Sequence, residues 1–407
     1  MRTLIALAMI GMVSLIGAAR GGEVDETANL RAEVAKLAKR VEELDRKERL
    51  FQGGSSWVDK VSISGDFRYR HEMIKQDLNI EDVDETERHR HRIRARLTIK
   101  GQVNEEVTME LRLASGSTDP VSTNQTLDNE FQTKNFSLDR ANVKYAPEAL
   151  KDFGMSFQIG KFGNPFHKPE KTQLIWDGDL SFEGGNMKAK FKVDPVEIFI
   201  VGAALWVEEN GTTADNGLWG IQPGVKWPIM DTGITFVGGV GGFWYTPVKH
   251  EGPFDDYFGN SEHPDGDGYE YDFNLLEVFG ELHFKLMEFP IVVYGDIVDN
   301  TNAPNEGTGY LFGITVGKKK KQWDWDFKYN YRDLEQDAVI GTFTDSDTGG
   351  GGTNIRGHKI GFGLRLMKNV DFGFTYMIND VDVEGIDPIG EHEVDYDRMQ
   401  LDLKFKF

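Results

Sequence analysis

The chain has 407 residues, of which 46 are glycine, 27 phenylalanine, 12 tyrosine and 8 tryptophan, and its mean hydropathy is -0.45. This composition favours aromatic-rich strands joined by polar turns, and no segment beyond residue 20 is apolar for long enough to form a transmembrane helix. The absence of cysteine excludes a disulfide scaffold, thiolate metal sites and cysteine nucleophiles. A net charge of -21 argues against nucleic acid as a partner, because lysine and arginine must neutralise phosphates.

Residues 1–19 are typical of a signal peptide. Arg2 precedes an apolar run over residues 4–16, and small residues follow at positions 17–19. The run is too short to cross the membrane as a stop-transfer helix. We therefore expect the chain to be exported.

Residues 23–51 show the spacing of a short coiled-coil helix. After residue 29, apolar residues recur at alternating intervals of four and three, at Leu30, Val34, Leu37, Val41, Leu44 and, after a polar position, Phe51. A seam of this length is marginal alone, so we expect a periplasmic helix that associates within an oligomer held together elsewhere. A solvated amphipathic arm without a partner is the alternative. Residues 52–56 are rich in glycine and serine and form the predicted linker.

Apolar and polar residues alternate with period two from residue 57 to residue 407, as in strands with one apolar and one polar face. The clearest segment places seven polar residues on one face: Arg88, Arg90, Arg92, Arg94, Arg96, Thr98 and Lys100. A single strand of this kind fits a soluble sandwich equally well. We expect sixteen strands, near residues 61–72, 88–103, 107–115, 137–146, 155–161, 185–192, 196–207, 217–227, 232–245, 271–286, 290–298, 309–317, 323–333, 355–367, 370–377 and 395–407.

The connections between these strands alternate in length. Seven are short, at residues 104–106, 147–154, 193–195, 228–231, 287–289, 318–322 and 368–369, and eight longer ones separate them. A sandwich has no reason to sort its loops in this way, whereas outer-membrane barrels have short turns at one end and long loops at the other. The sequence therefore predicts an all-β fold, a transmembrane antiparallel β-barrel of about 16 strands over residues 57–407, with an N-terminal periplasmic coiled-coil helix. One missed or invented hairpin would give fourteen or eighteen strands.

The last predicted strand is amphipathic and closes on an aromatic residue. Its apolar face carries Met399, Leu401, Leu403, Phe405 and Phe407. A strand ending in phenylalanine resembles the signal by which outer-membrane assembly machinery recognises its substrates. Aromatic residues also gather near predicted strand ends, as expected of an interfacial girdle, at Trp57, Trp219, Trp227, Trp244, Tyr245, Trp323 and Trp325.

Four segments resemble the putative porin family of Gram-negative bacterial outer membranes. They are WDGDL at residues 176–180, PIVVYGDIVDN at residues 290–300, YNYRDLEQDA at residues 329–338 and TDSD at residues 344–347 with the glycines that follow. The resemblance covers the leader, the coiled coil and essentially the whole barrel. It implies a water-filled outer-membrane channel, commonly trimeric, without catalytic residues. The expected partners are outer-membrane lipid, small hydrophilic solutes and ions, and further copies of the chain in a homotrimer.

Charge is distributed unevenly between the long loops and the strands. The loops at residues 73–87, 246–270, 334–354 and 378–394 together carry 23 acidic residues and 2 lysines, so we expect an acidic external rim. The polar strand faces are richer in arginine and lysine than in acids. A basic wall in a confined tube concentrates anions, which predicts an anion preference. In the alternative, these bases only pair with nearby acids and keep the interior wet.

The long loop at residues 162–184 follows the fifth predicted strand. In sixteen-stranded porins the loop at this place folds into the barrel and narrows it, so the resemblance implies Asp177 and Asp179 as the acidic side of a pore constriction. We place six arginines on the opposing basic wall: Arg68, Arg70, Arg92, Arg94, Arg96 and Arg140. In the alternative, the sequence WDGD forms only an Asx-type turn.

Other motifs are weak. His89 and His91 with Glu87 have a spacing that is more typical of an interfacial position than of a metal site. The acidic stretches at residues 265–268 and 345–347 lack the terminal glutamate of a calcium-binding loop. The sequence contains no P-loop, GxSxG or HExxH motif. We therefore predict no metal site, no cofactor and no enzymatic activity.

The sequence thus favours an outer-membrane porin, a passive channel for ions and small hydrophilic solutes with an anion preference. One alternative is a phosphate- or oxyanion-selective channel, which a row of arginines would serve by successive charge-assisted contacts. Another is a structural link from the outer membrane to the cell wall, with the coiled coil in contact with peptidoglycan.

Overall fold

The computed structural model describes residues 35–37, 39–40, 60–77, 85–211, 214–382 and 393–407. The chain divides into two units, Met1–Ser62 and Ile63–Phe407. The predicted signal peptide, the linker and most of the predicted coiled coil lie outside the described residues, although residues 35–37 and 39–40 are helical. Within the described ranges, no helix has both the length and the apolar character needed to span a membrane.

The second unit is built from antiparallel strands with four short 3₁₀ turns in three of the connections. The strands are β1 (Val61–Asp77), β2 (Thr86–Gln102), β3 (Val107–Ser115), β4 (Gln125–Thr126), β5 (Phe136–Tyr145), β6 (Ser156–Gly163), β7 (Ser181–Val193), β8 (Val196–Glu208), β9 (Asn216–Ile229), β10 (Ile234–Tyr245), β11 (Asn274–Leu286), β12 (Phe289–Asn300), β13 (Thr308–Gly317), β14 (Trp325–Leu334), β15 (Ile355–Met367), β16 (Val370–Asp382) and β17 (Glu393–Lys406). The 3₁₀ turns are η1 (Glu148–Phe153), η2 (Pro169–Lys171), η3 (Gly341–Phe343) and η4 (Thr348–Gly350).

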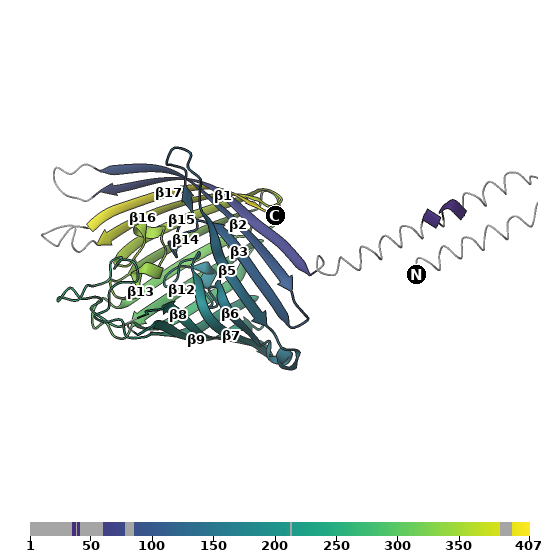
Figure 1. Ribbon diagram of the computed structural model, residues 1–407, viewed down its shortest axis with the longest axis horizontal. Coiled ribbons are helices and arrows are strands. Elements are labelled where there is room, and N and C mark those ends of the chain that lie inside the picture. The colour runs from purple at the N-terminus through teal and green to yellow at the C-terminus, as the bar shows by residue number, and fades with distance from the viewer. Residues whose placement is uncertain (1–34, 38, 41–59, 78–84, 212–213, 383–392) are drawn as a thin grey trace, which may run out of the picture. The chain divides into compact units, whose positions relative to one another are not determined.

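These strands form one closed barrel. The two-residue strand β4 pairs with β2 from within a loop, and the remaining strands pair with their neighbours in chain order until β17 meets β1 (Figure 1). The predicted barrel of sixteen antiparallel strands is therefore confirmed, and β4 is a short addition that the sequence did not indicate. The long connections lie at one end of the barrel and the short turns at the other (Figure 1).

The seam between the first and last strands is held at its end by the final residue. The backbone N–H of Phe407 donates to the carbonyl oxygen of Gly65 at 3.1 Å, and the N–H of Gly65 donates back at 3.2 Å. A Cβ atom at Gly65 would lie 2.5 Å from the carbonyl oxygen of Arg96 and 2.7 Å from the Phe407 ring. Glycine is thus required here because two neighbours approach the backbone closely.

Side chains alternate between the inside and the outside of the barrel. On β1, Arg68 and Arg70 are buried in the interior, while Phe67 and Tyr69, which alternate with them, are 40% and 37% exposed on the outer surface. An apolar exterior around a polar interior reverses the arrangement of a soluble protein and is that of a membrane-spanning barrel. The expectation that Tyr245 belongs to the aromatic girdle is wrong. Trp244 points outward, so by alternation Tyr245 points inward, and it is buried.

One part of the interior is an apolar core rather than a wet surface. The loop at residues 164–180 enters the barrel and packs Phe166 and Trp176 against Phe243, with ring centroids 4.9 and 5.5 Å apart. Trp176 also contacts Phe182 edge to face at 5.2 Å. A Cβ at Gly220 would lie 2.5 Å from the Phe166 ring, so the wall has a glycine where the loop docks. The wall residues of this core lie on β6 to β14: Phe162, Phe182, Val201, Leu205, Leu218, Phe243, Tyr245, Leu275, Tyr294, Val298, Leu311 and Leu334.

Two further loops join the same core. The loop at residues 246–273 contributes Tyr269 and Phe273, and the loop at residues 335–354 contributes a short apolar run at residues 338–340. Asn260 fastens the two loops, since its Nδ2 donates to the carbonyl oxygens of Gln336 and Val339 at 2.7 and 2.8 Å.

The expectation that the loop at residues 334–354 belongs to an external acidic rim is wrong. Asp337 and Asp345 are buried, and Asp347 forms ion pairs with arginines of the barrel wall. Asp345 and Asp347 contact cationic side chains on distant strands, and Asp337 accepts hydrogen bonds from Ser261, so all three carboxylates have partners in an inward position.

Candidate functional site

The interior opposite the apolar core is lined by charge pairs on adjacent strands β17, β1 and β2. We call this group the arginine wall. It consists of seven arginines, Arg68, Arg70, Arg90, Arg92, Arg94, Arg96 and Arg398, with five carboxylates, Asp66, Glu72, Asp179, Asp347 and Asp402. Period-two alternation places the strand members of this set on the inner face of the barrel.

The most buried contacts of the wall join β1 to β17. Arg70 binds Asp402 through two parallel hydrogen bonds of 2.7 and 3.0 Å, and its Nη1 lies 2.9 Å from Asp347. Arg398 donates to Glu72 at 2.6 Å and lies 2.8 Å from the other oxygen of Asp347. Asp347 thus links two arginines on neighbouring strands to the loop at residues 335–354. The bidentate contact between Arg70 and Asp402 fixes the relative orientation of the two side chains as well as pairing their charges.

The loop at residues 164–180 reaches the wall through Asp179. One oxygen of this carboxylate lies 3.4 Å from Arg94 and 3.3 Å from Arg96, and the other accepts from the hydroxyl of Thr123 at 3.1 Å. Asp66 pairs with the same two arginines at 3.1 and 2.8 Å. Burial alone would raise the pKa of Asp179, but Arg94 and Arg96 outweigh it and lower that pKa below its usual range. Asp179 therefore carries a negative charge beside two fixed positive charges.

Asp177 lies elsewhere, although only one residue separates it from Asp179. Its Oδ1 accepts from the backbone N–H of Asp179 at 2.6 Å, which is an Asx-type turn, and its Oδ2 accepts from the N–H of Ser346 at 3.0 Å. Burial, with a further contribution from Asp345, raises the pKa of Asp177 to about 8. Asp177 therefore joins two loops and does not face the arginines, so the two proposed acidic residues have different surroundings.

Arg68 and Arg92 belong to the wall but are held less tightly. Arg68 lies 4.0 Å from Asp402 and donates to the side chain of Asn124 in the loop that carries β4. Arg92 lies 3.6 Å from Glu72, and its Nε has no hydrogen-bond partner among the described residues. These two side chains keep more of their capacity for an incoming anion than Arg70 does.

Arg140 lies outside the wall. It is on β5, where its Nη1 is 3.8 Å from Glu110 and its Nε donates to Ser181 at 3.2 Å. Arg112 and Asp139 form an ion pair beside it, and the Ser181 hydroxyl donates to Asp139 at 3.1 Å. The structure therefore brings together five of the six predicted arginines, with Asp179 and without Arg140 or Asp177.

Sequence reasoning missed several members of the wall. Glu72 and Arg398 have the same parity as predicted inward residues on their strands, so alternation could have found them. Asp347 had no such signal, because an aspartate in a glycine-rich loop looks like a solvent-exposed residue.

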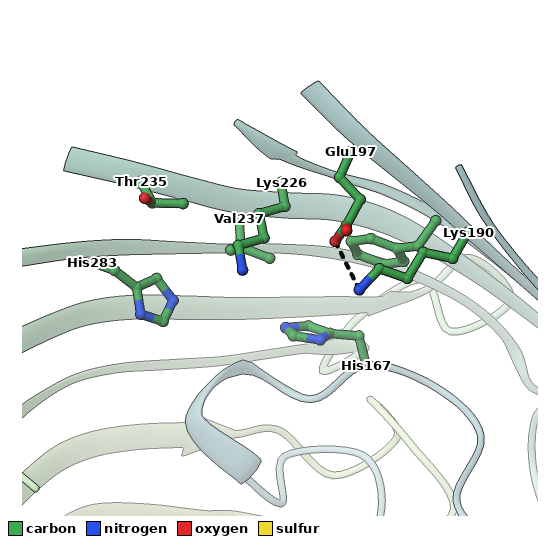
Figure 2. Close-up of a pocket in the computed structure, with 8 residues that line it drawn as sticks. His167, Lys190, Glu197, Lys226, Thr235, Val237 and His283 are labelled. Carbon is green, nitrogen blue, oxygen red and sulfur yellow. Dashed lines mark ion pairs between the residues drawn. The ribbon is translucent and has the colours of Figure 1, made fainter. Parts of the chain in front are cut away.

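Several cavities adjoin the inward loops. One, of about 260 Å³, has a mostly acidic lining, with Asp119, Asp139 and Asp179 beside Lys161. Two others have mostly basic linings. One of about 380 Å³, on the long-loop side, is lined by Arg88, Arg90, Arg92 and Arg398 together with Asp119 and other residues. The other, of about 480 Å³, lies on the short-turn side, where His167 projects from the loop toward strands that carry Lys190, Glu197 and Lys226 (Figure 2). Lys190 and Glu197 form an ion pair of 2.9 Å, and His283 completes the basic lining. Basic side chains outnumber acidic ones in these two cavities.

Comparisons with known proteins agree with this architecture. The family model described as "Putative porin" matches residues 76–250 and 280–407. A high-pH structure of OprB from Pseudomonas putida is similar with a TM-score of 0.56 and 11% identity, over 86% of this chain and 95% of that chain. The outer-membrane channel DcaP of Acinetobacter baumannii has a TM-score of 0.48 and 13% identity, over 85% of this chain and 97% of that chain. OmpF of Salmonella typhi in complex with daunomycin has a TM-score of 0.48 and 11% identity, with the same coverage.

No curated protein matches this sequence. At such low identity, the likeness to OprB shows the fold alone, whereas the family model spans most of the barrel. The chain belongs to the putative porin family, whose members are β-barrels of the bacterial outer membrane.

Proposed function

We propose that this protein is a passive channel for ions and small hydrophilic solutes, with a preference for anions. The observation that carries the proposal is the arginine wall, in which seven arginines outnumber the five carboxylates that they contact directly. Lys404 adds a further positive charge 3.1 Å from Asp402. The wall therefore keeps a net positive charge after its carboxylates are counted against its arginines.

This excess acts on solutes because the interior is confined. Field lines from fixed charges are focused in a narrow aqueous space with low-dielectric walls, so a small net charge raises the local concentration of counter-ions. Arginine stays protonated at neutral pH. One cavity on each side of the inward loops has a mostly basic lining, which favours anions there, whereas the cavity beside Asp179 is mostly acidic.

Single-channel recording in a KCl gradient tests the proposal. The wild-type reversal potential should lie on the anion-selective side, and Arg92→Gln should shift it toward cations because Arg92 is only loosely paired with Glu72. Arg356→Gln is the matched control, since Arg356 is an exposed arginine paired with Asp380. Cation selectivity in the wild type, or equal shifts in both variants, would refute the anion preference, and a barrel that does not conduct would refute the channel itself.

A phosphate- or oxyanion-selective channel is the second candidate. It is favoured by the long-loop cavity, where four arginines meet one aspartate, because guanidinium groups bind oxyanions through paired hydrogen bonds. Chloride conductance that is blocked by low phosphate concentrations would distinguish it from a general anion channel.

We also propose a homotrimer, and a contact with peptidoglycan through the predicted coiled coil at residues 23–51. The family resemblance supports the trimer, and the heptad spacing supports the coil. The mass of the detergent-solubilised particle tests the first, and co-sedimentation of the full chain with isolated peptidoglycan tests the second. The structural link between membrane and cell wall stands only if the second result is positive.

A further inference from the structure

The loop at residues 246–273 holds a cluster of metal-ligating side chains far along the chain from the arginine wall. The ligand atoms of His250, His263 and Asp267 all lie within 4.8 Å of one another, and no other such group of three occurs among the residues that the structure describes. The Nδ1 atoms of His250 and His263 lie 3.0 and 3.3 Å from the same oxygen of Asp267. The two imidazole rings have their centroids 4.0 Å apart.

These separations suit a tetrahedral metal ion. Ligand atoms at about 2.0 to 2.1 Å from a zinc ion are about 3.3 Å from one another in a tetrahedron. Without a metal, each Nδ1–H can donate to the shared carboxylate. A divalent ion would take the place of these hydrogens while contacting the same three atoms, and each neutral imidazole would then carry its proton on Nε2.

The backbone holds the three ligands in place. The N–H of His250 donates to the carbonyl oxygen of Tyr269 at 3.1 Å, and the N–H of His263 donates to that of Gly268 at 2.7 Å. Tyr269 is fully buried in the apolar core, so it fixes the position of the segment that follows Asp267. Because the ligands are anchored before any metal arrives, little conformational entropy remains to be lost on binding.

Two residues of this loop adopt backbone conformations that most residues avoid. His250 has a φ of 66°, which non-glycine residues adopt rarely. Gly268 has a φ of 141°, and a Cβ there would lie 2.2 Å from the carbonyl oxygen of Glu251. Strained or glycine-dependent backbone of this kind is concentrated at functional sites.

The charges nearby favour a cation. Asp265 places an oxygen 3.6 Å from the Nδ1 of His263, and its side chain is largely exposed and free to reach a fourth position. The loop at residues 246–270 carries seven acidic residues and one lysine. Calcium and magnesium prefer oxygen ligands, whereas imidazole nitrogen selects zinc, copper or nickel.

We propose that this loop binds one divalent transition-metal ion, of the zinc, copper or nickel class, through His250, His263 and Asp267, with a fourth position open to water or Asp265. The proposal does not depend on conduction. A bound ion would clamp residues 250 and 263–267 together, and Asn260 ties the same loop to the loop at residues 335–354. The sequence did not indicate this site because its ligands are separated by twelve and three intervening residues in an irregular loop, without a recognised spacing.

Titration of the full-length barrel in detergent with ZnCl₂, in the presence of excess CaCl₂, tests the site. Calcium occupies acidic clusters that lack imidazole, so the remaining zinc binding should saturate at one ion per chain. His250→Gln combined with His263→Gln should lower zinc affinity by at least about tenfold. His89→Gln is the matched control. His89 pairs with Glu87 at 2.6 Å but belongs to no group of three metal-ligating side chains among the described residues.

Three results would overturn the proposal: no saturable zinc binding by the wild type, unchanged affinity in the double variant, or an equal loss in the His89 control. Asp267→Asn serves as a second variant if the histidine double variant does not fold, and it should also weaken binding. Cobalt(II) provides an independent readout, since a tetrahedral site with nitrogen ligands gives visible absorption bands that the double variant should lack.

Discussion

The loop at residues 164–180 touches two contrasting regions of the barrel interior within four residues. Trp176 is 2% exposed and packs in the apolar core, while Asp179 lies between Arg94 and Arg96 on the arginine wall. The turn made by Asp177 separates them. Burial of apolar area is non-directional and insensitive to salt, whereas ion pairs are directional and respond to pH and salt. The core therefore anchors the loop, and the wall sets its orientation.

The largest expected effect comes from the core. Trp176→Ala should lower the free energy of unfolding of the detergent-solubilised barrel by about 3 to 5 kcal/mol, because it leaves a cavity among Phe182 and Phe243. Denaturant titration measures the change. Trp206→Ala is the control, since Trp206 is 63% exposed on the outer surface and should cost far less. Equal losses in the two variants would mean that the inward loop does not unfold together with the barrel.

Acid should weaken the charged contacts and leave the core intact. Burial opposes ionisation of Asp345, but Lys359 and Arg332 outweigh it and lower the pKa of Asp345 to about 2. A lowered folded-state pKa means that these ion pairs stabilise the fold fully above about pH 4 and lose their effect as the pH falls toward 2. Asp177 acts in the opposite sense, since its raised pKa favours the folded state as the pH falls below about 8.

Denaturant midpoints at several pH values separate these two effects. The wild-type midpoint should fall between pH 4 and pH 2, and Asp345→Asn should reduce that fall. Asp177→Asn should leave the fall of the midpoint between pH 4 and pH 2 unchanged. It should reduce the pH dependence of the midpoint between pH 4 and pH 8. An unchanged fall between pH 4 and pH 2 in Asp345→Asn would show that other carboxylates control the transition.

A smaller effect is expected at the contact between loop and wall. A double-mutant cycle of Asp179→Asn and Arg94→Gln should give a coupling energy of about 1 kcal/mol, because both side chains are mostly buried and 3.4 Å apart. In 1 M NaCl, where the screening length is about 3 Å, the coupling should shrink, while the cost of Trp176→Ala stays the same. A coupling that does not change with salt would mean that the contact is fully shielded from solvent.

Deletion of residues 23–51 should have the smallest effect. These residues lie in a separate unit from the barrel, so the midpoint of barrel unfolding and the single-channel conductance should not change. Failure of the truncated chain to form a barrel would show that the predicted coil is needed for assembly.

The parts of the fold that follow a local rule could be predicted from the sequence. Alternation with period two identifies the strands, their inner faces and hence Arg70, Arg94 and Arg96 on one wall, because the rule requires only neighbouring residues. The inward position of the loop at residues 335–354 depends instead on cations from distant strands, such as Arg332 and Lys359. The short apolar run at residues 338–340 was the one local sign of it.

The candidate site shows the same limit. Asp177 and Asp179 are equivalent in sequence, yet the turn between them sends one carboxylate to Ser346 and the other to Arg94 and Arg96. Only the packing of the whole loop decides which residue faces the arginines. The metal-ligating cluster of the loop at residues 246–273 is non-local in the same way.

The pairing of β17 with both β16 and β1 has a consequence for how the protein reaches its membrane. A chain that lacks residues 393–407 would leave the edges of two strands without partners, and each unpaired peptide group costs several kcal/mol in lipid. Insertion is therefore coupled to completion of the final strand. A chain interrupted before residue 393 would therefore be disfavoured in the bilayer, because its barrel cannot close.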